Sequence, residues 1–217
     1  LQLEPMPLHL PDFLDELLAF VRRIAPAGAV NGLAQCLLKL TVPGVPDIYQ
    51  GTELWDFSLV DPDNRRPVDF VARAKAASAP LPELAAQWRD GRVKQALIRR
   101  TLMLRKRVPQ LFEQGSYRPV AVEGPSRGSV VAFIRRAGDE WVLVAVPRFA
   151  SRAVAEEGGL AFRQHAWSGT SLKVEGVFAK PVHDVFRGRS MDLPSRLDLD
   201  DLWRECPVAL LSSVSPD

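Results

Sequence analysis

The chain has 217 residues, of which 47% are hydrophobic, so it can bury one large core or two small ones. Its 28 Lys and Arg nearly balance its 26 Asp and Glu, and the basic residues are scattered, which argues against a nucleic-acid-binding protein. No apolar run approaches the roughly 18 residues of a membrane-spanning helix, and the widely separated Cys36 and Cys206 predict neither disulfide nor metal site and favour a reducing cytoplasm.

The N-terminal part of the chain has the spacing of helices. Residues 1–11 lack the basic start of a signal peptide and are interrupted by prolines, so we expect the chain to begin inside a longer protein. Apolar residues at helical spacing predict one helix over Asp12–Ala25, ended by Pro26. A stripe of leucines predicts a second helix over Asn31–Leu40, which the following proline and glycine end.

A short apolar run, Val45–Tyr49, follows the second helix and precedes a long polar loop that reaches Pro67. Such a run between helices predicts a buried strand of a parallel sheet or barrel. Further along, helical spacing recurs in a short piece around Leu84–Trp88 and in a longer helix within Val93–Arg107. This half of the chain is therefore predicted to be α/β.

Beyond Pro109 the residues favour β-strands. Val130, Ala132 and Ile134 recur at every second position, as do Val142, Val144 and Val146 after a Gly-Asp turn, which predicts a half-buried antiparallel hairpin. The predicted strands are Tyr117–Val122, Ser129–Arg136, Trp141–Pro147, Ser171–Glu175, Val182–Phe186 and Val208–Val214. Residues 148–170 are predicted to form a long loop and Asp198–Cys206 a short helix, and the α/β and all-β parts should meet near residue 113.

Residues 43–70 carry most of the functional information. If Val45–Tyr49 is a barrel strand, the residues that follow lie at its C-terminal end, where barrel enzymes build their sites. Tyr49 and Trp55 offer flat faces that could stack on sugar rings. Acidic and amide side chains offer acceptors for hydroxyls, and two adjacent arginines offer rigid donor forks; these are Asp61, Asp63, Asn64, Arg65 and Arg66. The pattern favours a ligand rich in hydroxyl groups over a phosphate, for which glycine-rich backbone donors and a lysine would be expected.

Each of these features also has a purely structural explanation. The sequence Asp61-Pro62-Asp63-Asn64 is a good turn, and a tyrosine at a strand end can equally belong to the core. Arg65 and Arg66 could simply pair with nearby acids such as Asp61 or Asp69. No single residue of the segment therefore establishes a function.

Taken together, the motifs resemble one family. The segment PGVPDIYQGTE resembles the last barrel strand of glycoside hydrolase family 13, and the longer form LTVPGVPDIYQGTELWDFSLVDPDNRRPVDF is similar to maltooligosyltrehalose synthases. The preceding NGLAQCLLKL resembles the helix before that strand, and LMLRKRVPQLFEQGSYRPV resembles the passage into the family's C-terminal β domain. The resemblance is most specific over residues 29–70 and weaker over 96–147.

The resemblance implies a fold. Residues 1–113 would be the C-terminal end of a catalytic (β/α)8 barrel, with its last strand at about 45–50 between flanking helices. Residues 114–217 would be a C-terminal antiparallel β-sandwich domain. The remainder of the barrel, in a full-length chain, would then be a partner of this part.

The resemblance also implies an activity. The family converts the reducing-end α-1,4 link of a maltooligosaccharide into an α,α-1,1 link by a retaining mechanism with carboxylate nucleophile and acid. No carboxylate here matches those motifs, so the catalytic residues are expected upstream of Leu1, no cofactor or metal is expected, and the chain alone should be inactive. Tyr49, Trp55, Asp61, Asp63, Asn64, Arg65 and Arg66 would bind the leaving glucose. The alternatives are another family 13 enzyme and a non-catalytic carbohydrate-binding module.

Overall fold

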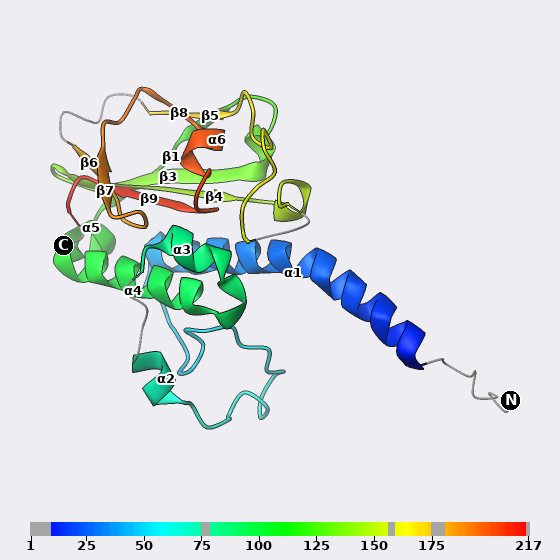
Figure 1. Cartoon of the computed structure of the whole chain (residues 1–217). Coiled ribbons are helices and arrows are strands. Elements are labelled where there is room, and N and C mark those ends of the chain that lie inside the picture. The colour runs from blue at the N-terminus through cyan, green and yellow to red at the C-terminus, as the bar shows by residue number, and fades with distance from the viewer. Residues whose placement is uncertain (1–9, 75–78, 156–158, 175–180, 216–217) are drawn as a thin grey trace, which may run out of the picture.

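A computed structural model describes residues 10–74, 79–155, 159–174 and 181–215. Within these ranges the chain forms helices first and antiparallel sheets afterwards, and Figure 1 shows the helices lying beneath the sheets. Part of the opening segment and the end of the predicted strand Ser171–Glu175 fall outside the described residues. None of the described helices is long and apolar enough to cross a membrane.

The first helix, α1 (Leu10–Thr41), is one continuous helix of 32 residues, whereas the sequence predicted two helices separated at Pro26. A proline inside a helix removes a backbone hydrogen bond and costs about 3 kcal/mol. Tertiary packing offsets this cost, because Pro26 and the residues directly after it, including Ala27, Ala29 and Val30, are buried. The half of α1 before Pro26 projects beyond the rest of the molecule (Figure 1).

The remaining helices of this half lie near the predicted positions. They are α2 (Phe70–Ala74), α3 (Leu81–Ala86), α4 (Arg92–Arg107) and α5 (Pro109–Glu113), with a 3₁₀ turn at Trp88–Asp90. The helices α3 and α4 confirm the prediction, while the short α2 and α5 were not predicted. Helix α4 packs along α1, and α3 packs on α4.

The strand predicted at 45–50 is not formed, and this prediction was wrong for the chain by itself. Residues 45–49 run in an irregular conformation, and Val45 is 97% exposed. A parallel strand is stable only between neighbours that accept and donate its backbone hydrogen bonds. The described part of the chain places no strand beside these residues.

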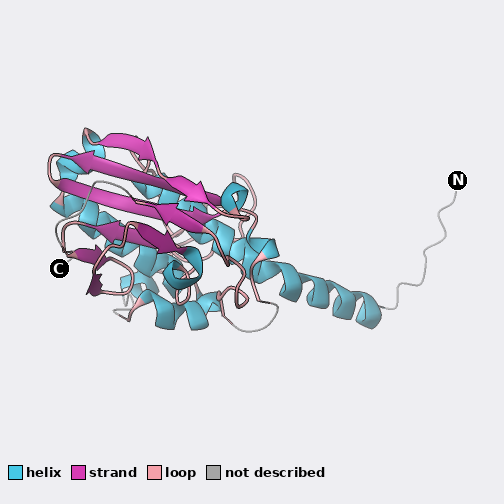
Figure 2. Ribbon diagram, turned by 90° about the horizontal axis from the view of Figure 1, so that it is seen from above, coloured by secondary structure: helices cyan, strands magenta, loops and turns pink. Residues whose placement is uncertain are grey.

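The C-terminal half contains two antiparallel sheets. The larger has the order β1-β3-β4-β9-β6-β7 and the smaller the order β2-β5-β8. Their strands are β1 (Ser116–Pro119), β2 (Ala121–Glu123), β3 (Val130–Ala137), β4 (Glu140–Pro147), β5 (Ser171–Lys173), β6 (Val182–Asp184), β7 (Arg189–Met191), β8 (Arg196–Asp198) and β9 (Ala209–Ser212). Figure 2 shows the larger sheet from above, with the helices behind it.

The hairpin of β3 and β4 is buried on both faces, although the alternating pattern predicted one solvent-exposed face. Phe133, Val142 and Val144 belong to the core shared with the helices. Ile134 and Leu143 belong to a second core, which also contains residues of the smaller sheet such as Leu172. The larger sheet therefore forms a middle layer between the helices and the smaller sheet, and both of its faces must be apolar.

Two smaller features also match the sequence. The predicted helix after Asp198 is present as α6 (Leu199–Leu202), and the Asp198 carboxylate caps it by accepting from the backbone N–H groups of Asp200 and Asp201. The predicted loop 148–170 contains a 3₁₀ turn at Ala150–Arg152 and an isolated bridge between Val154 and Phe162.

Candidate functional site

The segment predicted to bind sugar runs from the end of α1 to α2 and contacts α4 on the way, at Leu54. It is irregular, and Figure 1 shows it on the side of the helices that faces away from the sheets. The predicted turn is present within it: Asp63 N–H donates to the Val60 carbonyl at 3.1 Å, and Arg65 N–H donates to the Pro62 carbonyl at 3.0 Å. The tetrapeptide Asp61-Pro62-Asp63-Asn64 therefore forms the turn that the structural explanation predicted.

Trp55 fixes the middle of the segment to the helices. Its indole Nε1 donates to the Trp88 carbonyl at 2.6 Å, and the two rings meet edge to face at 6.5 Å between centroids. Lys94 Nζ donates to the neighbouring Leu54 carbonyl at 3.1 Å. Gly91 allows this approach, because its φ is +81° and an added Cβ would lie 2.8 Å from the Trp55 backbone nitrogen.

A second set of contacts fixes the segment near its start. Arg73, on α2, donates to the Gly51 carbonyl at 2.6 Å and pairs with Glu53 at 3.2 Å. Gln95, on α4, donates to the Arg73 carbonyl at 2.7 Å. The loop and α2 are therefore connected to α4 through side chains, even though the segment lacks regular secondary structure.

Three of the seven predicted sugar-binding residues line one cavity of about 320 Å³. These are Trp55, Asn64 and Arg66, and the cavity is also lined by Gln50, Asp56, Phe57 and Arg73. Tyr49, Asp61, Asp63 and Arg65 are not part of its lining. The Oδ1 atom of Asn64 is buried without a hydrogen-bond partner among the described residues, so it is an acceptor that a hydroxyl group could satisfy.

Both arginines of the segment are paired with carboxylates. Arg65 makes two hydrogen bonds to Asp61, at 2.5 and 2.7 Å, and Arg66 pairs with Asp63. The Arg66 hydrogen bond and the Leu59 N–H lower the pKa of Asp63, and the same pair raises the pKa of Arg66. Because the arginine side chains are 68% and 66% exposed, these pairs contribute little stability, and the guanidinium groups remain accessible to a ligand.

The two predicted aromatic surfaces differ in their exposure. Tyr49 is 46% exposed, so a ring could reach it from solvent. Trp55 is partly buried against the helical core, and its N–H group is already used by Trp88. Trp55 can therefore offer part of its ring to a ligand but no hydrogen bond.

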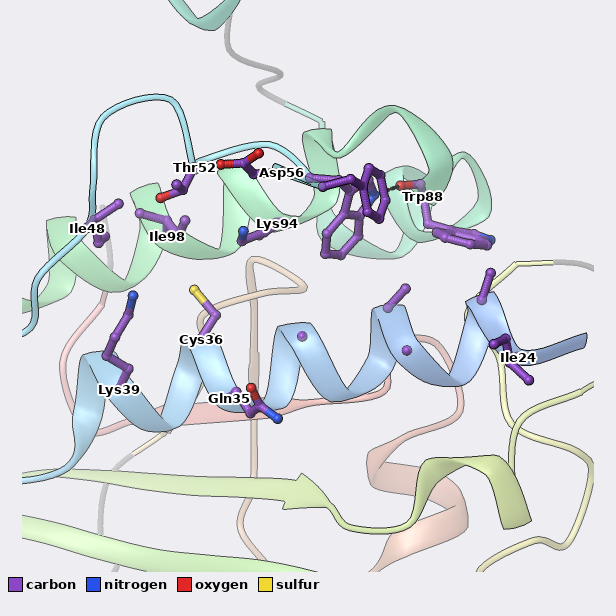
Figure 3. A pocket seen from close by; sticks show the side chains of 16 residues that line it. Ile24, Gln35, Cys36, Lys39, Ile48, Thr52, Asp56, Trp88, Lys94 and Ile98 are labelled. Carbon is purple, nitrogen blue, oxygen red and sulfur yellow. Dashed lines mark hydrogen bonds between the residues drawn. The ribbon is translucent and has the colours of Figure 1, made fainter. Parts of the chain in front are cut away.

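A larger cavity of about 580 Å³ lies between α1 and α4. Figure 3 shows Cys36 on α1 and Lys94 on α4 pointing toward each other across it, with Asp56 at its upper edge. Burial lowers the pKa of Lys94 and raises the pKa of Cys36. Trp55 lines both cavities.

Sequence reasoning did not select Trp88 and Lys94, which hold the segment in place. They are distant from it in sequence, and both lie in stretches whose spacing indicates only a helix. The glycine directly after the Trp88–Asp90 turn was the available signal, because a positive φ and a close backbone approach both favour glycine.

The side chains of this segment are suited to binding a ligand rather than to proton transfer. Hydrogen bonds from Ser58 lower the pKa of Asp56, and Asp63 has a lowered pKa as well, so both are ionised acceptors at neutral pH and unsuited to donate a proton. Among the described residues no group of His, Cys, Asp and Glu could hold a metal ion. The segment can accept hydrogen bonds from hydroxyl groups and donate from two guanidinium groups.

Comparisons with known proteins give a consistent result. Proteins of two strains of Mycobacterium tuberculosis, named as maltooligosyl trehalose synthases, are 47% identical over 157 residues, which are 72% of this chain. The matched region spans only 18% of those relatives. No family model matches the sequence.

Solved structures agree with the sequence relatives. The maltooligosyltrehalose synthase of Arthrobacter ramosus is 34% identical with a TM-score of 0.65, and the match covers 96% of this chain and 24% of that protein. A second maltooligosyl trehalose synthase structure, 26% identical, gives a TM-score of 0.65 and covers 93% of this chain. The resemblance seen in the sequence is confirmed: this chain is similar, in sequence and in structure, to one portion of the maltooligosyltrehalose synthases.

Proposed function

We propose that this chain is the C-terminal portion of an enzyme that converts the reducing-end α-1,4 link of a maltooligosaccharide into an α,α-1,1 link. The observation that carries the proposal is the 47% identity over 157 residues to proteins named as maltooligosyl trehalose synthases. The reaction is an intramolecular transfer: the reducing-end α-1,4 link breaks, the shortened chain forms a glycosyl-enzyme, and glucose is released. The glucose turns, and its anomeric hydroxyl attacks the glycosyl-enzyme to form the α,α-1,1 link and free the carboxylate. The substrate is a maltooligosaccharide, and no cofactor is required.

In this proposal residues 1–113 are the end of a (β/α)8 barrel and residues 114–217 are a C-terminal β-sandwich domain. The Val45–Tyr49 run, with Val45 and Tyr49 exposed, supports it. The described residues place no strand beside this run, which suits a position between barrel strands that lie elsewhere in a longer chain. Two free buried cysteines, Cys36 and Cys206, support a cytoplasmic location for the enzyme.

The segment 43–70 forms the wall of the pocket that holds the released glucose. Asn64 Oδ1 lacks a partner within the described residues, and Arg66 lies beside it around the same cavity. An enzyme that favours transfer over hydrolysis must retain the glucose and exclude water. Asp61 and Asp63 shape the turn, the exposed guanidinium of Arg65 offers a further donor to the sugar, and Tyr49 and Trp55 provide surfaces for the ring.

The catalytic carboxylates belong to other parts of the enzyme, so the purified chain should not form trehalose ends. Incubation with maltopentaose, followed by an assay of reducing ends, is expected to show no loss. An intact maltooligosyltrehalose synthase serves as the positive control. Turnover by this chain at a rate comparable to the control would contradict the assignment of the carboxylates to other parts of the enzyme.

A further inference from the structure

Arg135 is a fully buried arginine whose charge has an unusual environment. It lies in β3 on the side of the sheet that faces the helices, and it is 1% exposed. Buried arginines are normally paired with carboxylates. Among the described residues, the hydrogen bonds of Arg135 all go to backbone carbonyl oxygens.

These carbonyls belong to the C-terminal ends of α1 and α5 and to the residues that follow α5. Arg135 Nη1 donates to the Thr41 carbonyl at 3.1 Å, and Nη2 donates to the Phe112 carbonyl at 3.0 Å. Further bonds reach the carbonyls of Gly115 and Ser116 at 3.0 to 3.3 Å. Thr41 is the last residue of α1 and Phe112 lies in the last turn of α5. The C-terminal ends of helices carry partial negative charge, which balances the guanidinium.

The end of α1 is held by several donors, and Arg135 provides the last of them. Val42 N–H donates to the Leu38 carbonyl at 2.9 Å, and Arg105 Nη1 donates to the Leu40 carbonyl at 2.8 Å. The last carbonyls of a helix have no partner within the helix. The Thr41 carbonyl is the final one, and the donor that satisfies it comes from a strand 94 residues further along the chain.

The segment 42–66 begins directly after this carbonyl. Its next anchors are Arg73 on Gly51, Lys94 on Leu54 and Trp55 on Trp88. The direction in which residues 42–50 leave α1 therefore depends on the contacts at Thr41. We infer that Arg135 is a positioning residue, which fixes the exit of α1 and through it the course of the segment 42–66. The inference rests on the proposed function for the statement that this segment holds glucose. Through Arg135, the larger sheet therefore helps to shape the sugar pocket.

Arg135→Met tests the inference, because Met fills similar space without donors. In this chain, backbone amide exchange in the last turn of α1, residues 39–42, should become about ten-fold faster or more, because the variant loses one charged hydrogen bond at this helix end. Exchange within α4 should change less. In the full-length enzyme, the ratio of free glucose to trehalose-ended product should rise as well.

Arg100→Met is the matched control. Arg100, on α4, also donates to two backbone carbonyls, at Phe186 (2.5 Å) and Ala79 (3.0 Å), so it connects α4 to the turn after β6 and to the residues before α3. Its loss should affect exchange near those residues and leave residues 39–42 and the product ratio unchanged. If both variants accelerate exchange at 39–42 equally, Arg135 acts only on overall stability and the inference is overturned.

Arg135→Lys keeps the experiment decisive if the Met variant does not fold. A lysine has three donors from one nitrogen and cannot reach carbonyls on both sides as the planar fork does. Exchange at 39–42 should then rise by an intermediate amount, and unchanged exchange would overturn the inference. The exchange measurement needs no activity, so a full-length protein that makes no trehalose ends would contradict the proposed function while leaving this test valid.

Discussion

Arg65 and Arg66 illustrate how two explanations of one residue can both hold. Each is paired with an acid three or four residues before it, Arg66 with Asp63 and Arg65 with Asp61, as the structural explanation predicted. Each is also about two-thirds exposed, so that water surrounds most of the guanidinium. A ligand hydroxyl could therefore bind to either group without breaking its ion pair.

Replacing either arginine by alanine in the full-length enzyme should alter the fate of the glycosyl-enzyme intermediate more than its formation. A charged hydrogen bond to a sugar hydroxyl contributes roughly 1.5–3 kcal/mol, so glucose retention should weaken about ten-fold or more. Water then captures more of the intermediate, and free glucose rises relative to product. The ratio of the two products is measured beside the melting temperature.

Arg204→Ala is the matched control for this experiment. Arg204 is 71% exposed and pairs with Asp201 three residues before it, as Arg66 pairs with Asp63, but it lies after α6 in the C-terminal half. It should leave the product ratio unchanged. An unchanged ratio in both the Arg65 and Arg66 variants would remove this turn from the glucose site.

At the scale of elements, local sequence spacing was informative where neighbouring elements are present in the chain. Helix α4 and the hairpin of β3 and β4 lie close to their predicted positions because their partners, α1 and β9, pack on them. The predicted strand at 45–50 does not form, because the described part of the chain offers the apolar run no adjacent strand to pair with. Sequence spacing identifies a run suited to a strand, but the strand itself also requires its neighbours.

Pro26 and Trp55 are two further residues whose structural role the sequence alone did not predict. Pro26 indicated a helix end, but burial of the helix around it keeps α1 continuous. Trp55 lines a cavity with Asn64 and Arg66, and its part in sugar binding stays a prediction, while its indole N–H bonds to the Trp88 carbonyl and so serves the fold. Its partners, Trp88 and Lys94, come from distant parts of the sequence, and only the three-dimensional structure brings them together.

Gly91 offers a test of how the segment is held on the helices. An alanine there would require a strained positive φ and would place its Cβ 2.8 Å from the Trp55 backbone nitrogen. We expect Gly91→Ala to displace residues 54 and 55 and to lower stability by at least about 1 kcal/mol. Chemical denaturation and the tryptophan emission of the folded chain measure these effects.

Gly28→Ala is the control for that variant. Gly28 lies within α1, and an added Cβ would meet no atom within 4 Å. Because alanine favours helix over glycine by about 1 kcal/mol, this variant should gain stability or keep it. A Gly91→Ala variant as stable as the parent, with unchanged emission, would show that the close approach of segment and helix is not required.

The whole molecule carries an unusual amount of exposed apolar surface. Along the projecting half of α1 seven large apolar side chains are 43–49% exposed, namely Phe13, Leu14, Leu17, Leu18, Phe20, Val21 and Ile24. In the segment that follows α1, Val45, Phe57, Leu59 and Val60 are 77–97% exposed. Monomeric proteins rarely expose contiguous apolar patches larger than several hundred Å². Such a surface is expected where the remainder of a barrel would pack.

The isolated chain should therefore associate as its concentration rises, and it should bind an apolar dye. Replacing Leu14 and Leu18 together by Glu places charges on the projecting helix without touching the core, and should reduce both association and dye binding. Leu102→Glu, at a 39% exposed position on α4, is the control and should reduce neither to the same extent. Sedimentation across a concentration series measures association. A chain that stays monomeric at high concentration and binds no dye would mean that this surface needs no cover, and would weaken its assignment to a larger barrel.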